Sequence, residues 1–554
     1  MPNRVPSLTL ITAALLAPLT ASALSTALPP RSVTVVTTLP PPVVMCGNEP
    51  MPTLAAPYKM VCATDQEVIA DSGVDQGDNI RRALERLVDS QTGLFFPRGR
   101  YIVSGDLPLR SGNVLVGSPS GVTHFVNPSE KTSSIGQTLH SATNILVEGL
   151  VLDNIAINFF HAGTSVVRYN GLRGTTSELA QIWTHGGDEI VGNVLWREPA
   201  HPGLGIAAYG GRGARISGNL LGNGDAGPNA AMKRTTGPDA RTRRLAEQMA
   251  TLAAGNGTVP AAGLPRGHFT TALHVHGTTK TWINRNDITV AGTHVNDTRP
   301  AHPMAMLTNV QRLILMNNRF VVEGDAATAL VPLVVQAPQS MHITGNTLVR
   351  VPLQLASDPA GMRPTKRTEV NENRLVGATI SITQPVTGDD ESRTTIDDLR
   401  FLRNAFQNVD RSSCMISAPE PSQPGRTFGE RDNRVFLGGQ PAKTCNLRDL
   451  PPQLSAVTPV TPMKPMKPVT PLMPLKPAIV ASENGLPPTT ITPAPGDGNA
   501  TASMPEVVKP SIPTTASREP EAPRKRRWYK QASKFIEERS EEIIDRLRAM
   551  IQRL

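Results

Sequence analysis

The sequence predicts an all-β chain built as a parallel β-solenoid, followed by a proline-rich segment and a short amphipathic helix. Three observations lead to this prediction. An asparagine in a constant apolar frame returns about every 30 residues through the middle of the chain. Apolar and polar residues alternate within each repeat with the period of a strand that has one buried face. From residue 451 onward the composition changes to one rich in proline.

The repeated frame is an apolar residue, two spacers, Asn, one spacer and an apolar residue, as in MHITGNTLVRV at 341–351. Short strands at this interval, with no helices between them, are typical of a parallel β-solenoid. Asn suits a turn because it tolerates a left-handed backbone, and its amide can form a ladder between stacked coils. We therefore expect a structural role for Asn193, Asn219, Asn286, Asn318, Asn346, Asn373, Asn404 and Asn433.

Three places depart from the regular frame. The interval between Asn219 and Asn286 is roughly twice the others, so it holds either two coils or one coil with a long insertion. The last repeat has Glu430 where the others have an apolar residue. An earlier coil, NILVEGLVLDNIAI, has Leu150 in the place of Asn.

The N-terminal part of this region predicts a helix that covers the first coil. In DNIRRALERLVDS at 78–90, one helical face is apolar, and a helix there would protect the open edge of the solenoid. That face consists of Ile80, Ala83, Leu84, Leu87 and Val88.

This helix, followed by GLFFPRGRYIV and then LPLRSGNVLVG, resembles the N-terminal part of the pectin-lyase-like superfamily. The resemblance covers about residues 63–447 and implies a right-handed, single-stranded parallel β-helix with an N-terminal capping helix. The superfamily includes lyases, hydrolases, epimerases, phage tailspikes and non-catalytic adhesins, so the resemblance does not choose an activity. The Asp-Pro-His-Asp run of mannuronan C5-epimerases is absent, and the polygalacturonase motifs are not met as a set.

The chain is expected to fall into five parts. Arg4, an apolar run and Ala21-Ser22-Ala23 are typical of a signal peptide at 1–23, which predicts a secreted or periplasmic protein. After it we expect an N-terminal segment at 24–62, the β-helix at 63–450, a Pro/Thr-rich linker at 451–520 and a basic amphipathic helix at 521–554.

Four cysteines fit an exported protein. Cys46 and Cys62 flank the start of the repeat region, while Cys414 and Cys445 flank its end. We expect one disulfide within each couple; the alternative is four reduced, unrelated thiols.

The tail allows several interpretations. Proline at every third position through 459–477 predicts polyproline II, as a stiff spacer or as a ligand for an aromatic-lined groove. The final helix could form a homo-oligomer, contact an anionic membrane or envelope surface, or simply be solvated.

Outward positions, counted back from each Asn, predict a cluster of rings on one face. Trp183, Tyr209 and His276 fall in one outward column, with His274 in the column beside it. We expect the long interval that follows Asn219 to provide a groove wall or lid beside this face.

Polar residues follow the ring positions along the same coils. The glycine-rich turn HGGDE contains His185, Asp188 and Glu189, and the turn GGRGAR contains Arg212 and Arg215. Trp282 occupies the outward column of Glu189 and Arg215 one coil later.

These residue types suit a sugar polymer, because flat rings stack on sugar faces and arginine binds carboxylates. We expect Trp183, Tyr209, Trp282 and His185 to bind substrate. The net charge of +9 favours an acidic polysaccharide, and no recognisable nucleic-acid-binding module is present.

The preferred activity is that of a lyase or epimerase. His276 or His274 would remove a proton next to a carboxylate, which Arg212, Arg215 or a Ca²⁺ ion would neutralise. The alternatives are a non-catalytic polysaccharide-binding or scaffold protein and, third, a glycoside hydrolase that pairs Asp188 or Glu189 with Asp225.

Overall fold

The computed structural model describes most of the repeat region and not the two ends of the chain. The predicted signal peptide (1–23), linker (451–520) and final helix (521–554) lie outside the described residues. Among the described residues, no helix combines the length and apolar character needed to cross a membrane. The described residues are 44–52, 59–87, 92–136, 142–159, 162–174, 180–198, 202–222, 237–253, 268–292, 302–324, 330–337, 339–356, 368–383, 399–410, 412–418, 428–435 and 440–449.

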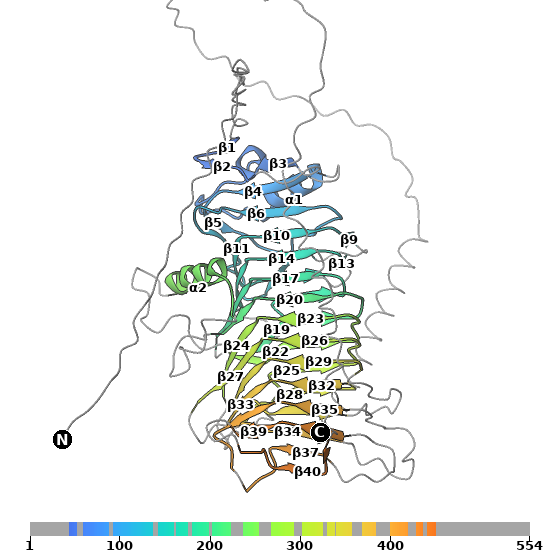
Figure 1. Cartoon of the computed structure of the whole chain (residues 1–554). Helices are drawn as coiled ribbons and strands as arrows, with labels where there is room; N and C mark the ends of the chain where they lie inside the picture. The colour runs from blue at the N-terminus through green and yellow to red at the C-terminus, as the bar shows by residue number, and fades with distance from the viewer. Residues whose placement is uncertain are drawn as a thin grey trace, which may run out of the picture. The chain divides into compact units, whose positions relative to one another are not determined.

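Successive coils of the chain stack into three long parallel sheets (Figure 1). Sheet I has fourteen strands: β3 (Lys59–Cys62), β4 (Thr92–Phe96), β6 (Val114–Gly117), β10 (Leu146–Glu148), β14 (Val166–Arg168), β17 (Glu189–Val191), β20 (Arg215–Ser217), β23 (Trp282–Asn284), β26 (Ile314–Met316), β29 (His342–Thr344), β32 (Thr368–Asn371), β35 (Leu399–Leu402), β38 (Phe428–Arg431) and β41 (Arg448–Asp449).

Sheets II and III complete each coil. Sheet II has twelve strands: β5 (Gly99–Ile102), β7 (Thr123–Val126), β11 (Leu150–Asp153), β15 (Gly171–Gly174), β18 (Val194–Arg197), β21 (Leu220–Leu221), β24 (Asp287–Ala291), β27 (Arg319–Glu323), β30 (Thr347–Val349), β33 (Arg374–Val376), β36 (Ala405–Gln407) and β39 (Arg434–Val435). Sheet III has eleven: β8 (Ser133–Ile135), β12 (Ile155–Phe159), β16 (Ile182–His185), β19 (Gly203–Tyr209), β22 (Phe269–His276), β25 (Ala305–Thr308), β28 (Leu333–Gln336), β31 (Leu353–Ala356), β34 (Ile380–Thr383), β37 (Ile416–Ser417) and β40 (Thr444–Cys445).

Each complete coil therefore runs through sheets III, I and II in turn, and every strand pairs with the strand one coil away. Two small sheets pair β1 (Met45–Cys46) with β2 (Glu49–Pro50), and β9 (Ala142–Thr143) with β13 (Ala162–Gly163). The prediction of a right-handed, single-stranded parallel β-helix is confirmed.

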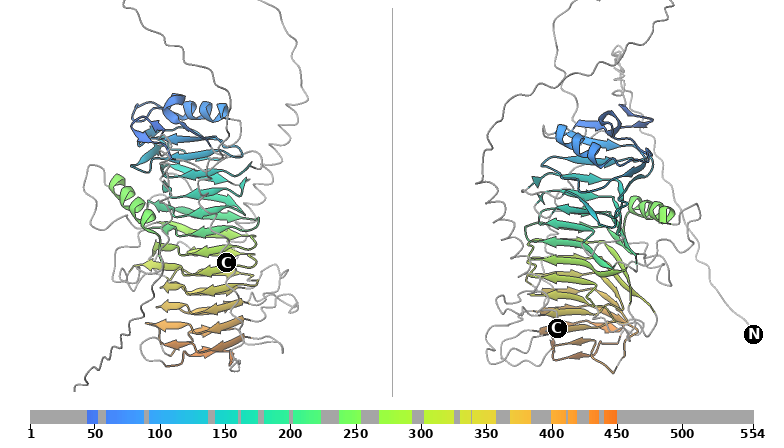
Figure 2. Two further views of the ribbon diagram at one scale, coloured as in Figure 1. Left: turned by 45° about the horizontal axis from the view of Figure 1, so that its top comes forward. Right: turned by 180° about the vertical axis from the view of Figure 1, so that it is seen from behind.

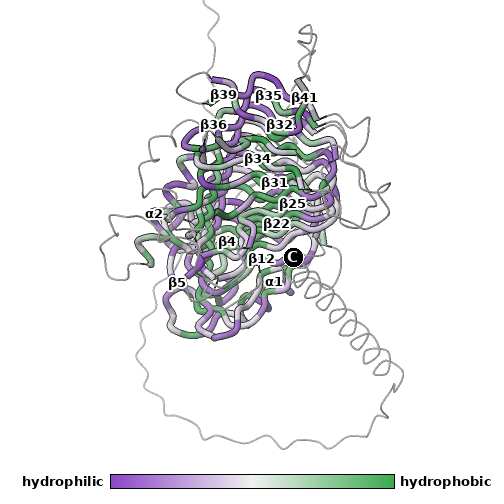
Figure 3. The backbone as a smooth tube through the Cα atoms, turned by 90° about the horizontal axis from the view of Figure 1, so that it is seen from below, coloured by the Kyte–Doolittle hydropathy of each residue, from purple (hydrophilic) through white to green (hydrophobic). Residues whose placement is uncertain are grey.

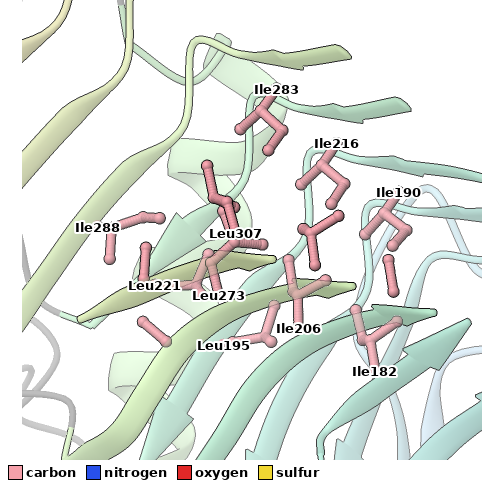
Figure 4. Close-up of a cluster of buried hydrophobic side chains, with 14 of the residues drawn as sticks. Ile182, Ile190, Leu195, Ile206, Ile216, Leu221, Leu273, Ile283, Ile288 and Leu307 are labelled. Carbon is pink, nitrogen blue, oxygen red and sulfur yellow. The ribbon is translucent and has the colours of Figure 1, made fainter. Parts of the chain in front are cut away.

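The core lies between the three sheets, where their inward side chains meet. In one coil Ile182, Ile190 and Leu195 come from sheets III, I and II, and all three are fully buried (Figure 4). Hydrophobic and hydrophilic residues follow one another along each coil (Figure 3). The period-2 alternation in the sequence therefore reports the inward and outward sides of short strands.

The repeated asparagines form a buried hydrogen-bonded ladder at the turn between sheets I and II. Asn318 shows the pattern: its Nδ2 donates to Ile283 O at 2.9 Å and to Asn346 Oδ1 at 3.0 Å. Its Oδ1 accepts from the backbone N and the Nδ2 of Asn286, at 3.0 and 2.9 Å. The structural role expected for all eight asparagines is confirmed.

One detail of that expectation is wrong. The left-handed residue is not the ladder asparagine but the residue before it, for example Gly192 (φ 65°), Arg285 (φ 56°) or Glu372 (φ 55°). The asparagine is therefore selected for its amide hydrogen bonds and not for backbone freedom.

The ladder has a defined beginning and end. Asn170, which the sequence analysis missed, donates to Asn193 Oδ1 at 3.2 Å and accepts the backbone N–H of Leu150 at 3.1 Å. At the other end, Glu430 Oε2 accepts from Asn433 Nδ2 at 3.1 Å, in the place where another asparagine would stand. The two irregular positions, Leu150 and Glu430, are thus the two ends of the ladder.

The long interval after Asn219 holds one coil with an insertion, because β20 and β21 pair directly with β23 and β24. The insertion includes α2 (Ala240–Ala253), which lies against the outside of sheet II (Figure 2). Its buried side chains Leu245, Met249 and Ala250 pack on Val151 and Val194.

The expected groove wall beside the ring cluster is therefore not formed by α2, since that cluster lies on sheet III. Apolar side chains on the outside of sheet II hold the helix there instead, and Arg241 joins its first turn to Glu148 at 2.7 Å.

The expected end cap and both disulfides are present. Helix α1 (Gly77–Arg86) buries Ile80, Ala83 and Leu84, while Val88 lies outside the described residues. A 3-10 helix, η1 (Ala63–Gln66), precedes it. Disulfides join Cys46 to Cys62 and Cys414 to Cys445.

Candidate functional site

Five ring side chains gather on the outer surface of sheet III. We call them the ring cluster: Trp183, His185, Tyr209, His274 and His276. The ring centroids of Trp183 and Tyr209 are 5.3 Å apart, and those of Tyr209 and His274 are 5.1 Å apart. The centroid of His276, an exposed residue, lies 6.0 Å from that of Tyr209. The prediction that Trp183, Tyr209, His274 and His276 lie close together on one outer face is confirmed, whereas His185 was predicted only in the turn that follows.

The alignment within the cluster differs from the predicted one. His185, and not Trp183, pairs with Tyr209 across the strands, and Tyr209 pairs with His276. Trp183 pairs with Ala207, which pairs with His274. The turn after β16 is shorter than the turn after β19. Counting back ten residues from Asn193 therefore reaches Trp183 and not His185, the residue that pairs with Tyr209. Because the displacement preserves the period of two, Trp183 still faces outward and contacts Tyr209 diagonally.

Glycine in the turns lets these coils approach closely. A Cβ on Gly210 would lie 3.0 Å from His185 Nε2, and one on Gly211 would lie 2.4 Å from the Cα of Gly186. Both Gly210 (φ 62°) and Gly211 (φ 70°) are left-handed. The glycine-rich turns therefore place the imidazole of His185 over the backbone of the next coil.

Hydrogen bonds fix two of the imidazoles. Tyr209 Oη lies 2.9 Å from His274 Nδ1, and His276 Nδ1 lies 2.6 Å from the hydroxyl of Thr308. Burial lowers the pKa of His274 to about 4, with the neighbouring His276 adding to the shift, and burial raises the pKa of Tyr209. Near pH 7 the Tyr209–His274 pair is therefore an uncharged hydroxyl beside a neutral imidazole.

Thr308 was missed as a site residue. It occupies the outward column of Tyr209 and His276 one coil further on, so the same count from the asparagines places it there.

The charged candidates lie apart from the ring cluster. Glu189, Arg215 and Trp282 pair across β17, β20 and β23, on the outside of sheet I. Arg215 Nη1 is 3.7 Å from Glu189 Oε1, and both side chains are partly exposed, so this is a weak surface ion pair. Arg212 is exposed in the turn between sheets III and I. Trp282 therefore belongs to a different face from Trp183 and Tyr209.

Asp188 lies inside the coil and not on its surface. It is 1% exposed, and its Oδ1 accepts the backbone N–H of Ser165 at 2.8 Å. Burial raises the pKa of this carboxyl to about 7, against the opposing effect of backbone hydrogen bonds. A carboxyl in this place cannot reach a polymer bound outside, so the pairing with Asp225 expected for a hydrolase has no support. Asp225 itself lies outside the described residues.

The sequence analysis allowed a Ca²⁺ ion at this site. In the part of the chain that the structure describes, no three His, Cys, Asp or Glu residues are grouped so that they could hold a metal ion.

Comparisons with known proteins give likenesses of fold. No family model and no curated protein sequence matches the chain. The surface adhesin PfbA of Streptococcus pneumoniae is 10% identical over 70% of this chain and 98% of its own, with a TM-score of 0.38. The catalytic domain of a GH87 α-1,3-glucanase, solved with nigerose, is 12% identical over 72% of this chain and 67% of its own, with a TM-score of 0.39.

A polygalacturonase from Erwinia carotovora is 11% identical over 72% of this chain and 97% of its own, with a TM-score of 0.34. At these identities the likeness concerns the fold alone. The three stacked sheets described above form a parallel β-helix, the fold that the resemblance in the sequence implied.

Proposed function

We propose that this protein binds a polysaccharide along the outer surface of sheet III. The observation that carries the proposal is the ring cluster, in which Trp183, Tyr209 and His274 lie within 5.3 Å of their neighbours. Indole and phenol rings offer flat apolar surfaces to sugar rings, and their polar edges serve sugar hydroxyls. Partial exposure leaves Trp183, His185 and Tyr209 open to a ligand on this side.

The lengths of the connections also support sheet III as the binding surface. The turn from sheet I to sheet II is at most two residues long in every coil except that of β6 and β7, for example Gly192-Asn193 and Gly218-Asn219. Connections that enter sheet III are longer in several coils, such as 222–268 and 292–304. Loops that vary in length beside a rigid scaffold are where binding sites usually lie.

A lyase- or epimerase-like reaction on an acidic polysaccharide is the second candidate. It is favoured by the hydrogen bond between Tyr209 and His274, which places a neutral imidazole next to a hydroxyl and so suits proton transfer. His276 would be the other base, and Arg212 would bind the substrate carboxylate. A glycoside hydrolase has less support, because Asp188 is buried and Glu189 lies on the outside of sheet I, away from the ring cluster.

We further propose that the protein works outside the cytoplasm. Two disulfides close the ends of the repeat region, and such bonds persist in oxidising compartments. The signal peptide expected at 1–23 agrees with this location. Secretion is tested by locating the mature protein in cell fractions and determining its N-terminal residue.

Affinity electrophoresis in gels that contain single polysaccharides tests the main proposal. We expect at least one polymer to retard the wild-type protein and Trp183→Ala to remove that retardation. The matched control is Trp282→Ala, which removes the same side chain from sheet I. Retardation that survives Trp183→Ala but not Trp282→Ala would place the binding surface on sheet I and refute the proposal.

The catalytic candidate has its own assay. A lyase would raise the absorbance of unsaturated uronates when it is incubated with a uronate polymer, and an epimerase would change the polymer's uronate composition without chain cleavage. Binding with neither signal favours a non-catalytic protein.

A further inference from the structure

The three sheets differ in the charge of their outer surfaces. Among the outward positions of the described sheet III strands, none is Asp, Glu, Lys or Arg. Besides the ring cluster, the surface carries amides, hydroxyls and small apolar side chains. Its polar members include Asn158, Gln336, Gln354, Ser381 and Thr383.

The other two sheets carry charges on the corresponding side. Outward positions of sheet I include Glu189, Arg215, Glu369 and Arg400. Those of sheet II include Asp153, Arg173, Asp287, Arg319 and Arg374. Several of these groups form ion pairs along their own sheet, such as Arg319 with Asp287 at 2.7 Å. The lack of charge is therefore particular to sheet III and not a general property of the coil.

This pattern constrains the chemistry of a ligand. A uronate polymer carries a carboxylate on every unit, and its recognition relies on arginine or lysine at close range. Amides and hydroxyls both donate and accept hydrogen bonds, as sugar hydroxyls do, without a charge to neutralise. The imidazole of His274, held by Tyr209, adds no charge near pH 7.

The surface is also long enough for a polymer. Sheet III has eleven strands, which at ~4.8 Å between neighbours extend over roughly 48 Å. The rings lie on β16, β19 and β22, and partly exposed amides and hydroxyls follow on β28, β31 and β34. The third to fifth of the eleven strands thus offer stacking surfaces, and the strands on either side of them offer hydrogen-bonding groups.

We propose that the ligand of sheet III is an uncharged, hydroxyl-rich polysaccharide and not a uronate polymer. The inference rests on the proposed function and specifies the substrate class of the same surface. On this inference the net charge of +9 does not contribute to binding on sheet III. The inference also counts against a lyase or an epimerase, because both act on uronate polymers.

A matched pair of polymers tests the inference: polygalacturonate and the galactan obtained from it by carboxyl reduction, which differ only in the charged group. Each is used in affinity electrophoresis and in isothermal titration at low and high NaCl, beside neutral glucans and mannans and the acidic polymers alginate and hyaluronan. We expect binding to one or more neutral polymers, unchanged by salt, and a roughly ten-fold or greater loss in Trp183→Ala but not in Trp282→Ala.

Two other outcomes are distinguishable. Binding only to acidic polymers, weakened by salt, would overturn the neutral-ligand inference while leaving sheet III as a polysaccharide site if Trp183→Ala still abolishes it. Absence of binding to every polymer in both groups would refute the proposed function, and the inference with it.

Discussion

Removing one asparagine from the middle of the ladder tests how the fold is held together. Asn318 is 1% exposed, and its side chain takes part in four hydrogen bonds with Ile283, Asn286 and Asn346. Asn318→Ala removes all four, and leaves the Asn286 backbone N–H and the Ile283 carbonyl without these partners inside the coil. At about 1 kcal/mol for each bond, the free energy of unfolding should fall by about 4 kcal/mol.

Urea unfolding followed by circular dichroism measures this loss. Asn317→Gly is the matched control, because Asn317 is the neighbouring residue and its φ of 54° suits glycine. We expect the control to stay within about 0.5 kcal/mol of the wild-type protein. If Asn318→Ala unfolds at the same urea concentration as the control, the ladder does not stabilise the fold in the way described.

Three further predictions concern charge and covalent links. The pKa of Asp188 is about 7 in the folded chain against 3.8 ordinarily, so the folded state holds an extra proton between these values and loses stability as pH rises; Asp188→Asn should raise the melting temperature at pH 8 and not at pH 4. The pKa of His274 is about 4 against 6.5, so stability should rise with pH across that window, and His274→Gln should flatten the rise in the same melting series. Cys414→Ser opens a disulfide that joins residues 31 apart and should lower the free energy of unfolding in urea by about 3 kcal/mol. Dithiothreitol should cost the wild-type protein at least as much, because it also opens the Cys46–Cys62 bond; equal stability of Cys414→Ser and the wild-type protein would contradict this.

The fold could be predicted from the sequence because its main signals are local and repeated. Every coil with a ladder asparagine except the last places an apolar residue three positions before the asparagine, and all place another two positions after it, so a single frame predicts a strand of sheet I, a strand of sheet II and the turn between them. Val167, Asn170 and Leu172 also fit this frame, and only the shorter interval to Asn193 kept Asn170 from being recognised.

The candidate site was harder to predict because it depends on the lengths of turns. The shorter turn after His185 moved Trp183 out of the column assigned to it, although not out of the cluster. The assignment of Arg215 and Trp282 to the same site failed for another reason. They do face outward, but the turn between sheets III and I directs them to a different side of the coil. The lack of charge on sheet III depends on which outward positions share a sheet, and the turn lengths decide this.

Glu430 affects whether a second chain can add to the end of the asparagine ladder. A terminal asparagine with an unused Nδ2 would be ready to join the first coil of a second chain, much as a strand edge recruits another strand. The Glu430 carboxylate occupies that donor, and its other oxygen accepts from Thr444 within the same chain. Asn433 Nδ2 donates both to Phe401 O and to Glu430, so the last ladder asparagine presents no unused donor to another chain, while sheet I continues for one more strand through the pairing of Glu430 with Asp449.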